Sequence, residues 1–536
     1  MTDFQLYKRL FCFEQKGQEH GTINIEVEMW DQIKTQITKM KIQIIKTQDN
    51  EIIYLNDGII LRVQSLQDVI NNPQNFTNLE QIQNLQWKKE NEINMMKIVK
   101  SMAFWNGKVL KDVGGYFLDG LKQGFWREII DNYWSQAEVY VFGEYYKNNK
   151  IGVWKYIFHN NIIGLGQYNY KGQRISKWIE LSDKFSNRSQ ITYIGEYQNG
   201  QKIGLWEIWY KDYETKRNKQ IGGGLYDQIN SIKIGRWIEN CNNFRDCSQV
   251  IYQGQYKNGK KVGRWDILYR NQQSEAFQQM QNYIIKITTK FSGGGSYDDQ
   301  VQGDQIKIGS WIEISEEFYK WSQVTFQGEY KDGKRIGKWE IWFKDCHTNQ
   351  KKLIGGGFYD EKSSTKIGKW IEQNLRFYYN SQVTWTGQYK NGQKVGRWDL
   401  IHEEQQIGGG LYKEDGDSEI KIGNWIELSH SYRDWSSVTY SGEYKEDKKV
   451  GRWDIWYKDW ETKKNEQLGG GHYDEISSIK KGVWIELSDI FDRYSQVIYD
   501  GEYQNGKKVG IWMELEKKRW KLQEGFKKIK DINYGN

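Results

Sequence analysis

The chain has 536 residues, with 54 glycines, one proline, 26 tryptophans and 36 tyrosines. Its 77 basic and 70 acidic residues are interspersed and leave a formal net charge of +7. This charge distribution argues against a nucleic-acid-binding protein. Four cysteines without zinc-site spacing, no apolar run of about 18 residues and no signal-peptide pattern predict a soluble cytoplasmic protein without a disulfide framework or a membrane span.

Residues 1–75 contain no repeat. Their pattern predicts a small cap or arm that is either helical or a mixture of helix and strand. Apolar residues alternate with polar ones over 23–29, as in a strand, whereas those at 33, 37, 40 and 44 follow one face of a helix. Asn56-Asp57-Gly58 lies between two apolar runs and predicts a hairpin turn. The pattern of residues 76–113 predicts a helical lead-in at Leu79, Ile82 and Leu85, followed by a decayed repeat at Trp87 and Trp105.

Residues 114–516 contain a repeated unit that ends in Lys/Arg-x-Gly-x-Trp, with serine replacing the glycine in the third copy. The fourteen tryptophans are Trp126, Trp154, Trp178, Trp206, Trp237, Trp265, Trp311, Trp339, Trp370, Trp398, Trp425, Trp453, Trp484 and Trp512. Within each of seven pairs the spacing is 28 residues, and between pairs it varies from 24 to 46. The connection within each pair has a constant length and is expected to be packed. The connection between pairs varies in length and is expected to be a surface loop.

Each unit has the pattern of a β-hairpin with one aromatic face. Tyr252 and Gly254 share a strand face, Asn258-Gly259 supplies the turn, and Trp265 lies on the returning strand. A strand glycine leaves room for an indole to lie across the backbone. We therefore expect a mainly β fold, an elongated open antiparallel sheet of consecutive hairpins that forms a rod; a seven-bladed propeller is the alternative. Residues 517–536 predict a basic capping tail with helical spacing.

The string Gly-Glu-Tyr-x-Asn-Gly-Lys-x-x-Gly occurs at Gly195–Gly204 and at Gly501–Gly510. It resembles the MORN repeat, in the variant form whose Gly-x-Gly has become Gly-x-Trp. The resemblance covers about 400 residues. It implies hairpins stacked into a twisted single-layer sheet that serves scaffolding, oligomerisation or docking of partners, and it also implies phospholipid binding.

The basic residue of each unit has two interpretations. It could belong to a stripe that contacts lipid headgroups or acidic cytoskeletal tails, or its stem could cover a neighbouring ring with a cation-π contribution. The candidate anionic-surface contacts are Lys202, Lys261, Arg335, Lys394, Lys449 and Lys508. Three tryptophans with the opposite strand parity are candidates for a partner-binding surface: Trp209, Trp342 and Trp456.

No catalytic, cofactor or metal constellation is recognisable. The Trp-Ile-Glu carboxylates occur once per pair, too far apart for shared acid-base or metal chemistry. The triple glycines lack the Lys-Ser/Thr of a phosphate-binding loop. Serines in the constant connections, such as Ser248, fit turn capping better than phosphorylation.

These features predict a non-enzymatic repeat scaffold that mediates protein-protein interaction at the cytoskeleton or cell cortex, without cofactors, and that could self-associate. The alternative is peripheral binding of anionic phospholipid membranes through the basic edges.

Overall fold

The computed structural model describes sixteen segments of the chain. They are residues 21–31, 36–47, 49–67, 76–90, 98–270, 276–279, 281–282, 291–299, 305–374, 377–414, 418–429, 432–433, 436–459, 461–489, 491–517 and 525–535.

The first strands form a separate four-stranded antiparallel sheet in the order β1-β2-β3-β4. Their bounds are β1 Gly21–Asp31, β2 Gln36–Lys46, β3 Glu51–Asn56 and β4 Ile59–Ser65. The strand over 23–29 and the turn at Asp57-Gly58 are confirmed. The helix expected around residues 37–44 is wrong, because this segment also alternates with period two and pairs on both sides, with β1 and β3. Residue 33 lies outside the described segments.

The helix α3 spans Leu79–Asn84 and begins at the N-cap Asn78, whose side chain accepts a hydrogen bond from the Gln81 amide. It contains Leu79 and Ile82 of the predicted helical lead-in, whereas Leu85, the third residue of that spacing, already begins a strand. The chain turns directly into β5, Leu85–Lys89, which pairs with β6, Ile98–Trp105.

The repeats form one long antiparallel sheet in which successive strands are neighbours. Its first half consists of β7 Lys108–Leu118, β8 Leu121–Ile129, β9 Val139–Tyr146, β10 Asn149–Phe158, β11 Asn161–Tyr168, β12 Arg174–Leu181, β13 Gln190–Gln198, β14 Gln201–Lys211, β15 Asn218–Tyr226, β16 Lys233–Asn240, β17 Gln249–Lys257 and β18 Lys260–Arg270.

An insertion follows, which accounts for the longest spacing of 46 residues between two tryptophans. It includes β19 Gln278–Gln279, β20 Gln281–Asn282 and β21 Phe291–Ser292, and part of it lies outside the described residues. The main sheet resumes because β18 also pairs with β22. Its second half consists of β22 Gly294–Tyr297, β23 Lys307–Ile314, β24 Gln323–Lys331, β25 Lys334–Lys344, β26 Lys351–Tyr359, β27 Lys366–Gln373, β28 Thr384–Lys390, β29 Gln393–His402, β30 Gln405–Tyr412, β31 Lys421–Leu428, β32 Ser437–Lys445, β33 Lys448–Lys458, β34 Asn465–Tyr473, β35 Lys480–Leu487, β36 Gln496–Gln504, β37 Lys507–Lys517 and β38 Lys527–Asn533.

The end of the chain corrects the predicted tail. Residues 527–533 form β38, which pairs with β37, rather than a basic helix. The side chains of Lys528, Lys530 and Asp531 are charged and exposed, and backbone pairing with an existing strand edge outweighs the helical spacing of only three apolar residues, Leu522, Phe526 and Ile529. The first of these residues, Leu522, lies outside the described segments.

The predicted fold class is confirmed as a mainly β chain of consecutive hairpins in a long open antiparallel sheet. Pairing continues across every boundary between hairpin pairs, for example between β14 and β15, so the units are not separate propeller blades. The described residues include no pairing of β5 with β38, and the sheet therefore stays open.

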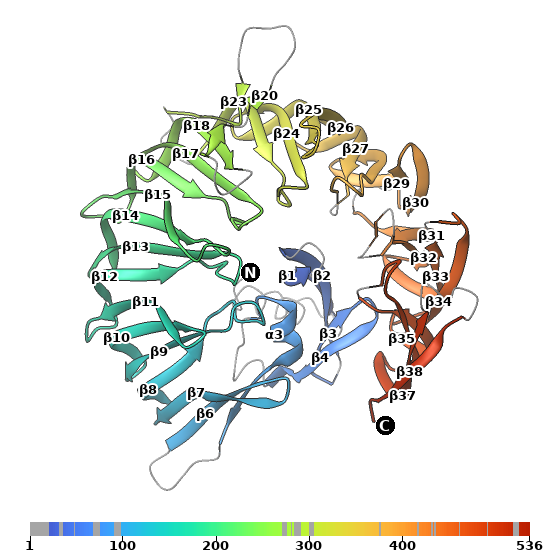
Figure 1. The fold of residues 1–536 in the computed structure, drawn as a ribbon, viewed down its shortest axis with the longest axis horizontal. Helices are drawn as coiled ribbons and strands as arrows, with labels where there is room; N and C mark the ends of the chain where they lie inside the picture. The colour runs from blue at the N-terminus through green and yellow to red at the C-terminus, as the bar shows by residue number, and fades with distance from the viewer. Residues whose placement is uncertain are drawn as a thin grey trace.

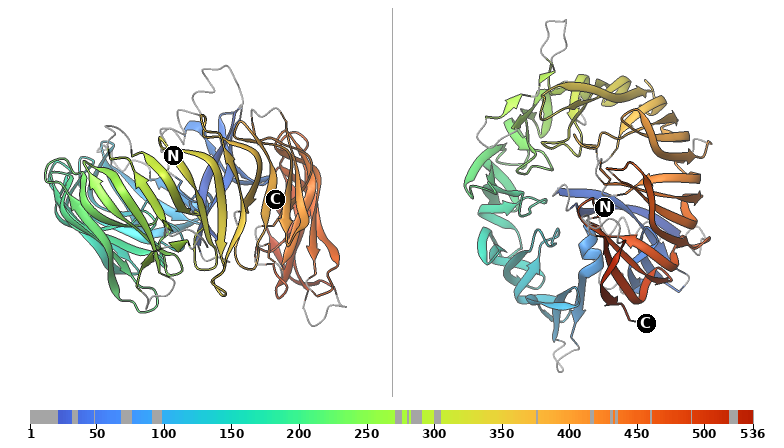
Figure 2. Two further views of the ribbon diagram at one scale, coloured as in Figure 1. Left: turned by 90° about the horizontal axis from the view of Figure 1, so that it is seen from above. Right: turned by 45° about the vertical axis from the view of Figure 1, so that its right-hand side comes forward.

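The sheet curves along its length into an incomplete ring, and the β1–β4 sheet lies inside it (Figure 1; Figure 2). The register shifts by one bulge in every repeat, for example between Gln253 and Gln255, and again between Gly223 and Leu225. A bulge bends its strand and increases the local twist, so regularly repeated bulges give a uniform curvature.

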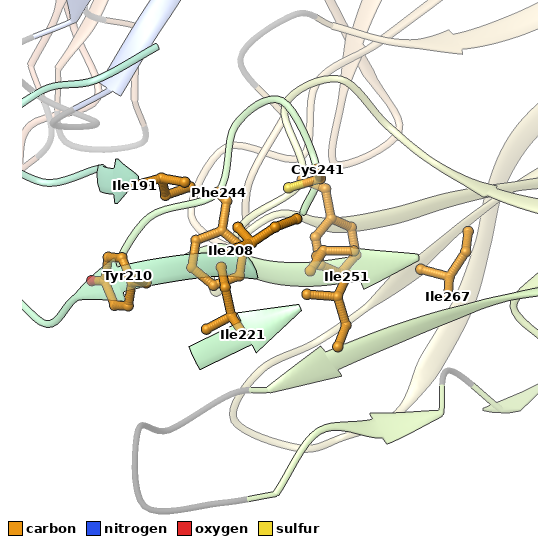
Figure 3. Close-up of a cluster of buried hydrophobic side chains, with 10 residues drawn as sticks. Ile191, Ile208, Tyr210, Ile221, Cys241, Phe244, Ile251 and Ile267 are labelled. Carbon is orange, nitrogen blue, oxygen red and sulfur yellow. The ribbon is translucent and has the colours of Figure 1, made fainter. Parts of the chain in front are cut away.

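The constant connections form a second layer over the aromatic face of the sheet. In one of them, residues 241–248, Phe244 packs above Ile208, Tyr210 and Ile221 and is fully buried (Figure 3). Phe185, Phe318, Phe377 and Phe491 occupy the corresponding positions and are also buried. The expectation that this connection is packed is confirmed.

Neighbouring connections are joined by a buried serine. Ser248 Oγ donates to the Phe318 carbonyl oxygen at 2.6 Å, and Ser322 Oγ donates to that of Phe377 at 2.6 Å. Each hydroxyl thus satisfies a backbone acceptor of the next repeat pair. These serine hydroxyls therefore have a structural role, but the prediction that they cap their own turn is wrong, because each donates to a carbonyl of the next connection.

Candidate functional site

An uninterrupted row of aromatic rings, here called the aromatic ladder, runs from Phe117 to Tyr534. The fourteen repeat tryptophans alternate with tyrosines, and each ring meets the next edge to face. Tyr256 and Trp265, for example, have centroids 5.3 Å apart and planes at 88°. This geometry is the preferred one for aromatic pairs and adds to the burial of their area.

The strand glycines make room for the ladder. A Cβ atom on Gly254 would lie 2.3 Å from the indole of Trp265, and all fourteen tryptophans cover a glycine in this way. In the triple-glycine segment, a Cβ atom on Gly222 or Gly223 would instead lie 2.3 Å from a backbone carbonyl oxygen of an adjacent strand, while Gly224 lies under Trp237. The triple glycines therefore serve close strand packing.

The basic residue of each unit lies over its own tryptophan. All fourteen do so, with the charged atom between 3.9 and 4.8 Å from the ring centroid, as for Lys261 over Trp265 at 3.9 Å. Each also pairs with a glutamate. A desolvated cation-π contact contributes about 1 to 2 kcal/mol.

One glutamate, two basic residues and one tyrosine hydroxyl form what we call an edge cluster, and each hairpin pair has one. The seven clusters are Glu128 with Lys122, Lys150 and Tyr145; Glu180 with Arg174, Lys202 and Tyr197; Glu239 with Lys233, Lys261 and Tyr256; Glu313 with Lys307, Arg335 and Tyr330; Glu372 with Lys366, Lys394 and Tyr389; Glu427 with Lys421, Lys449 and Tyr444; and Glu486 with Lys480, Lys508 and Tyr503.

The electrostatics of a cluster favour its charged form. Burial by itself raises the pKa of Glu427, but the ammonium groups of Lys449 and Lys421 and the Tyr444 hydroxyl outweigh it and lower the pKa to about 2. The same balance lowers the pKa of Glu239 and Glu313. Conversely, burial, with the Glu313 carboxylate adding to it, raises the pKa of Tyr330 to about 12.

Each of the six candidate anionic-surface residues is the second cation of its edge cluster, meaning the later of its two basic residues in the chain. Lys202, Lys261, Arg335, Lys394, Lys449 and Lys508 pair with Glu180, Glu239, Glu313, Glu372, Glu427 and Glu486, respectively. Each glutamate neutralises one of its two cations, so the edge does not present a continuous stripe of free charge. This placement favours the structural interpretation of the basic residues. The glutamate of the repeated Trp-Ile-Glu motif is the sequence feature from which this pairing could have been predicted.

Trp209, Trp342 and Trp456 lie half-buried on the face opposite the ladder, as strand parity predicts. Their indole N–H groups donate to Glu207, Glu340 and Ser441 at 3.0 to 3.1 Å. Leu205, which shares this face, is well exposed. The role of the three indoles in binding a partner stays a prediction.

A turn from the N-terminal sheet docks against the repeats at one place, and the sequence analysis missed it. Asp57 Oδ1 lies 2.7 Å from Lys449 Nζ, and the Gly58 carbonyl oxygen accepts from the Lys480 amide at 3.0 Å. The Ile60 amide donates to the Gly506 carbonyl oxygen at 3.1 Å. We call Asp57-Gly58 the docked turn. Its Asp-Gly sequence predicted the turn but not the cation that it meets.

Two further observations concern the described part of the chain. It contains no group of three or more His, Cys, Asp or Glu side chains placed to hold a metal ion. No helix in it is long and apolar enough to cross a membrane.

No protein-family model and no curated protein matches the chain in sequence. Among solved structures, it is similar to the WD40 domain of SCAP from fission yeast, with 8% identity and a TM-score of 0.21, over 83% of this chain and 89% of that one. It is also similar to a mutant of the NanB sialidase from Streptococcus pneumoniae, with 9% identity and a TM-score of 0.17, over 91% of this chain and 87% of that one. TM-scores this low carry no argument about fold or function.

Proposed function

We propose that this protein is a non-enzymatic repeat scaffold that binds other proteins at the cytoskeleton or cell cortex, as a member of the MORN-like repeats would. The observation that carries the proposal is the docked turn, because the repeat edge there holds a polypeptide through one ion pair and two backbone hydrogen bonds. The same edge recurs along the sheet, so one chain offers several comparable positions.

The opposite face supports the same proposal. Its half-buried Trp209, Trp342 and Trp456 recur in every second hairpin pair, and Leu205 on β14 and Phe358 on β26 are exposed. Aromatic residues flanked by polar groups are typical of protein-binding surfaces. Peripheral binding of anionic phospholipid through the basic edge has less support, since each edge cluster already holds a carboxylate between its cations.

Proximity labelling with the full chain in its native cell tests the scaffold proposal. We expect a defined set of labelled proteins that includes cytoskeletal components, and a reduced set for the combined Trp209→Ala, Trp342→Ala and Trp456→Ala variant, whose substitutions lie outside the ladder. Labelling indistinguishable from that of a freely diffusing protein would contradict the proposal. Flotation with anionic vesicles at low salt tests the lipid alternative, which requires binding that falls as salt rises.

A further inference from the structure

The docked turn occupies a position between two edge clusters. Lys449 belongs to the cluster of Glu427, and Lys480 belongs to the next cluster, that of Glu486. Tyr473 of the ladder lies between them, with its hydroxyl 3.5 Å from the Asp57 carbonyl oxygen. We call this arrangement of a second cation, a ladder tyrosine and the first cation of the next cluster an interpair site.

Two other interpair sites have the same loop. The loops Tyr226–Lys233 and Tyr359–Lys366 have the length of Tyr473–Lys480. In all three the residue after the tyrosine is an aspartate whose amide donates to the residue before the lysine, at 2.8 to 2.9 Å. In all three a serine two residues before the lysine has φ of 57°. The backbone frame that receives Gly58 is therefore repeated twice.

The neighbouring hairpin turn is repeated as well. At the occupied site it is Asn505-Gly506, whose glycine carbonyl accepts from Ile60. The two other sites have Asn258-Gly259 and Asn391-Gly392, with the same left-handed backbone angles. In each of the three, the glycine amide donates to the carbonyl of the first cation, at 3.0 to 3.1 Å.

The two sites differ from the occupied one in how far they are covered. The Lys480 side chain is 7% exposed, whereas those of Lys233 and Lys366 are 28% and 29% exposed. Tyr473 is 2% exposed, whereas Tyr226 and Tyr359 are only half-buried. The surface that the docked turn covers is thus left accessible at these two places, which we call the open sites.

Charge complementarity defines what fits them. Each edge cluster contains two cations that share one glutamate, so its three charged groups carry one positive charge in excess. At the occupied site Asp57 supplies the matching carboxylate to Lys449. The open sites present Lys202 and Arg335 in that position, each already paired with a single glutamate.

We propose that the two open sites bind acidic β-turns, tight turns with an aspartate followed by glycine, presented by a hairpin of a partner protein. The aspartate pairs with Lys202 or Arg335, and the glycine carbonyl accepts from the amide of Lys233 or Lys366. A glycine is required there because a Cβ on Gly58 would lie 2.6 Å from the Tyr473 ring. This inference rests on the proposed scaffold function and gives the chemistry of its partner.

The probe for the test is a synthetic hairpin peptide with the sequence of residues 50–66, closed by a disulfide between two added terminal cysteines. Isothermal titration into the full chain should show two sites per chain. The same peptide with asparagine in place of the turn aspartate should bind about tenfold more weakly, since a charge-assisted contact is lost. In the full-chain Asp57→Asn variant the tethered turn is loosened but keeps its backbone hydrogen bonds, so the peptide should still titrate two sites.

Matched variants locate the binding. The combined Lys202→Met and Arg335→Met variant should lose the peptide, whereas Lys394→Met should retain it. Lys394 has the same role in its edge cluster, but its interpair site already contains a carboxylate, Glu419 Oε1, which accepts from the Lys394 amide at 3.3 Å. Equal thermal stability of these variants separates loss of binding from loss of fold.

The inference is overturned if the peptide does not bind, if its asparagine form binds equally well, or if binding survives in the combined variant. Each of these results leaves the scaffold proposal intact, because that proposal is judged by the labelled partners and by the three outward tryptophans. Conversely, if the peptide binds but proximity labelling finds no partners, the proposed cellular function is wrong and the proposed binding site stands.

Discussion

A single carboxylate at the ladder edge connects three strands. Glu427 on β31 accepts from Tyr444 on β32 and pairs with Lys421 on its own strand and Lys449 on β33. The cations in turn cover Trp425 and Trp453. Removing one partner would leave the others buried with uncompensated charge, which is the costly way to break a buried ion pair.

The lowered pKa of Glu427 predicts acid sensitivity. A carboxyl whose pKa falls from 4.5 to about 2 on folding stabilises the folded state above pH 4.5, and this contribution is lost as the pH falls towards 2. We expect the free energy of unfolding to decrease over that window, by on the order of 3 kcal/mol from this group. Denaturant unfolding between pH 2 and pH 6 measures it.

The Glu427→Gln variant is the control for this prediction. It should be less stable than the wild type at pH 6 and should show a shallower loss of stability below pH 4.5, because one titrating group is gone. An identical pH dependence for the two proteins would show that Glu427 does not contribute. The other clusters retain their own acid sensitivity in both proteins.

At the scale of one element, each hairpin contributes only part of the aromatic ladder, and its rings contact rings on the neighbouring strands. Trp339 on β25 covers Gly328 and contacts Tyr330 and Tyr359 on the strands to either side. A two-stranded hairpin is marginal in water, so its stability depends on these interstrand ring contacts.

Truncation of Trp339 to alanine should therefore act locally. We expect a loss of about 3 to 5 kcal/mol of local stability, because a buried indole leaves a cavity. Hydrogen exchange should accelerate in β24 to β26, while β10 to β14 keep their protection. Cooperative loss of protection in the whole sheet would contradict the nearest-neighbour picture.

The connection layer makes a second prediction at this scale. Ser322→Ala removes the donor to the Phe377 carbonyl and leaves a buried acceptor unpaired, at a cost of about 1 to 3 kcal/mol. Ser363→Ala in an exposed variable loop is the control, and its cost should stay below about 0.5 kcal/mol. Urea midpoints of the two variants compare them. Equal midpoints would mean that the serine link between connections is not stabilising.

At the scale of the molecule, the β1–β4 sheet bridges two sides of the ring. Gln81 Nε2 after that sheet donates to the carbonyl oxygen of Tyr133 at 2.8 Å, near the start of the array. The docked turn meets Lys449 and Lys480 near its end. The internal sheet thus holds together parts of the open sheet that do not pair with each other.

The Asp57→Asn variant tests this bridge. Loss of the contact to Lys449 should loosen the turn, and we expect amide exchange in β3 and β4 to rise roughly fivefold. Asp119→Asn, in the Asp-Gly turn between β7 and β8, is the matched control and should leave those amides unchanged. Unchanged exchange in Asp57→Asn would show that the backbone hydrogen bonds alone hold the turn.

Local patterns in the sequence determined the hairpins, the glycine beneath each tryptophan and the outward face of Trp209, because period-two alternation and turn residues act within a few positions. The same patterns misjudged β2 and β38, where pairing with a neighbouring strand outweighs a weak helical spacing. Only the tertiary structure decided the curvature, the Glu427 type of cluster and the docking of Asp57. These features depend on bulges accumulated over many strands, and on charges brought together from distant parts of the chain, which no local pattern records.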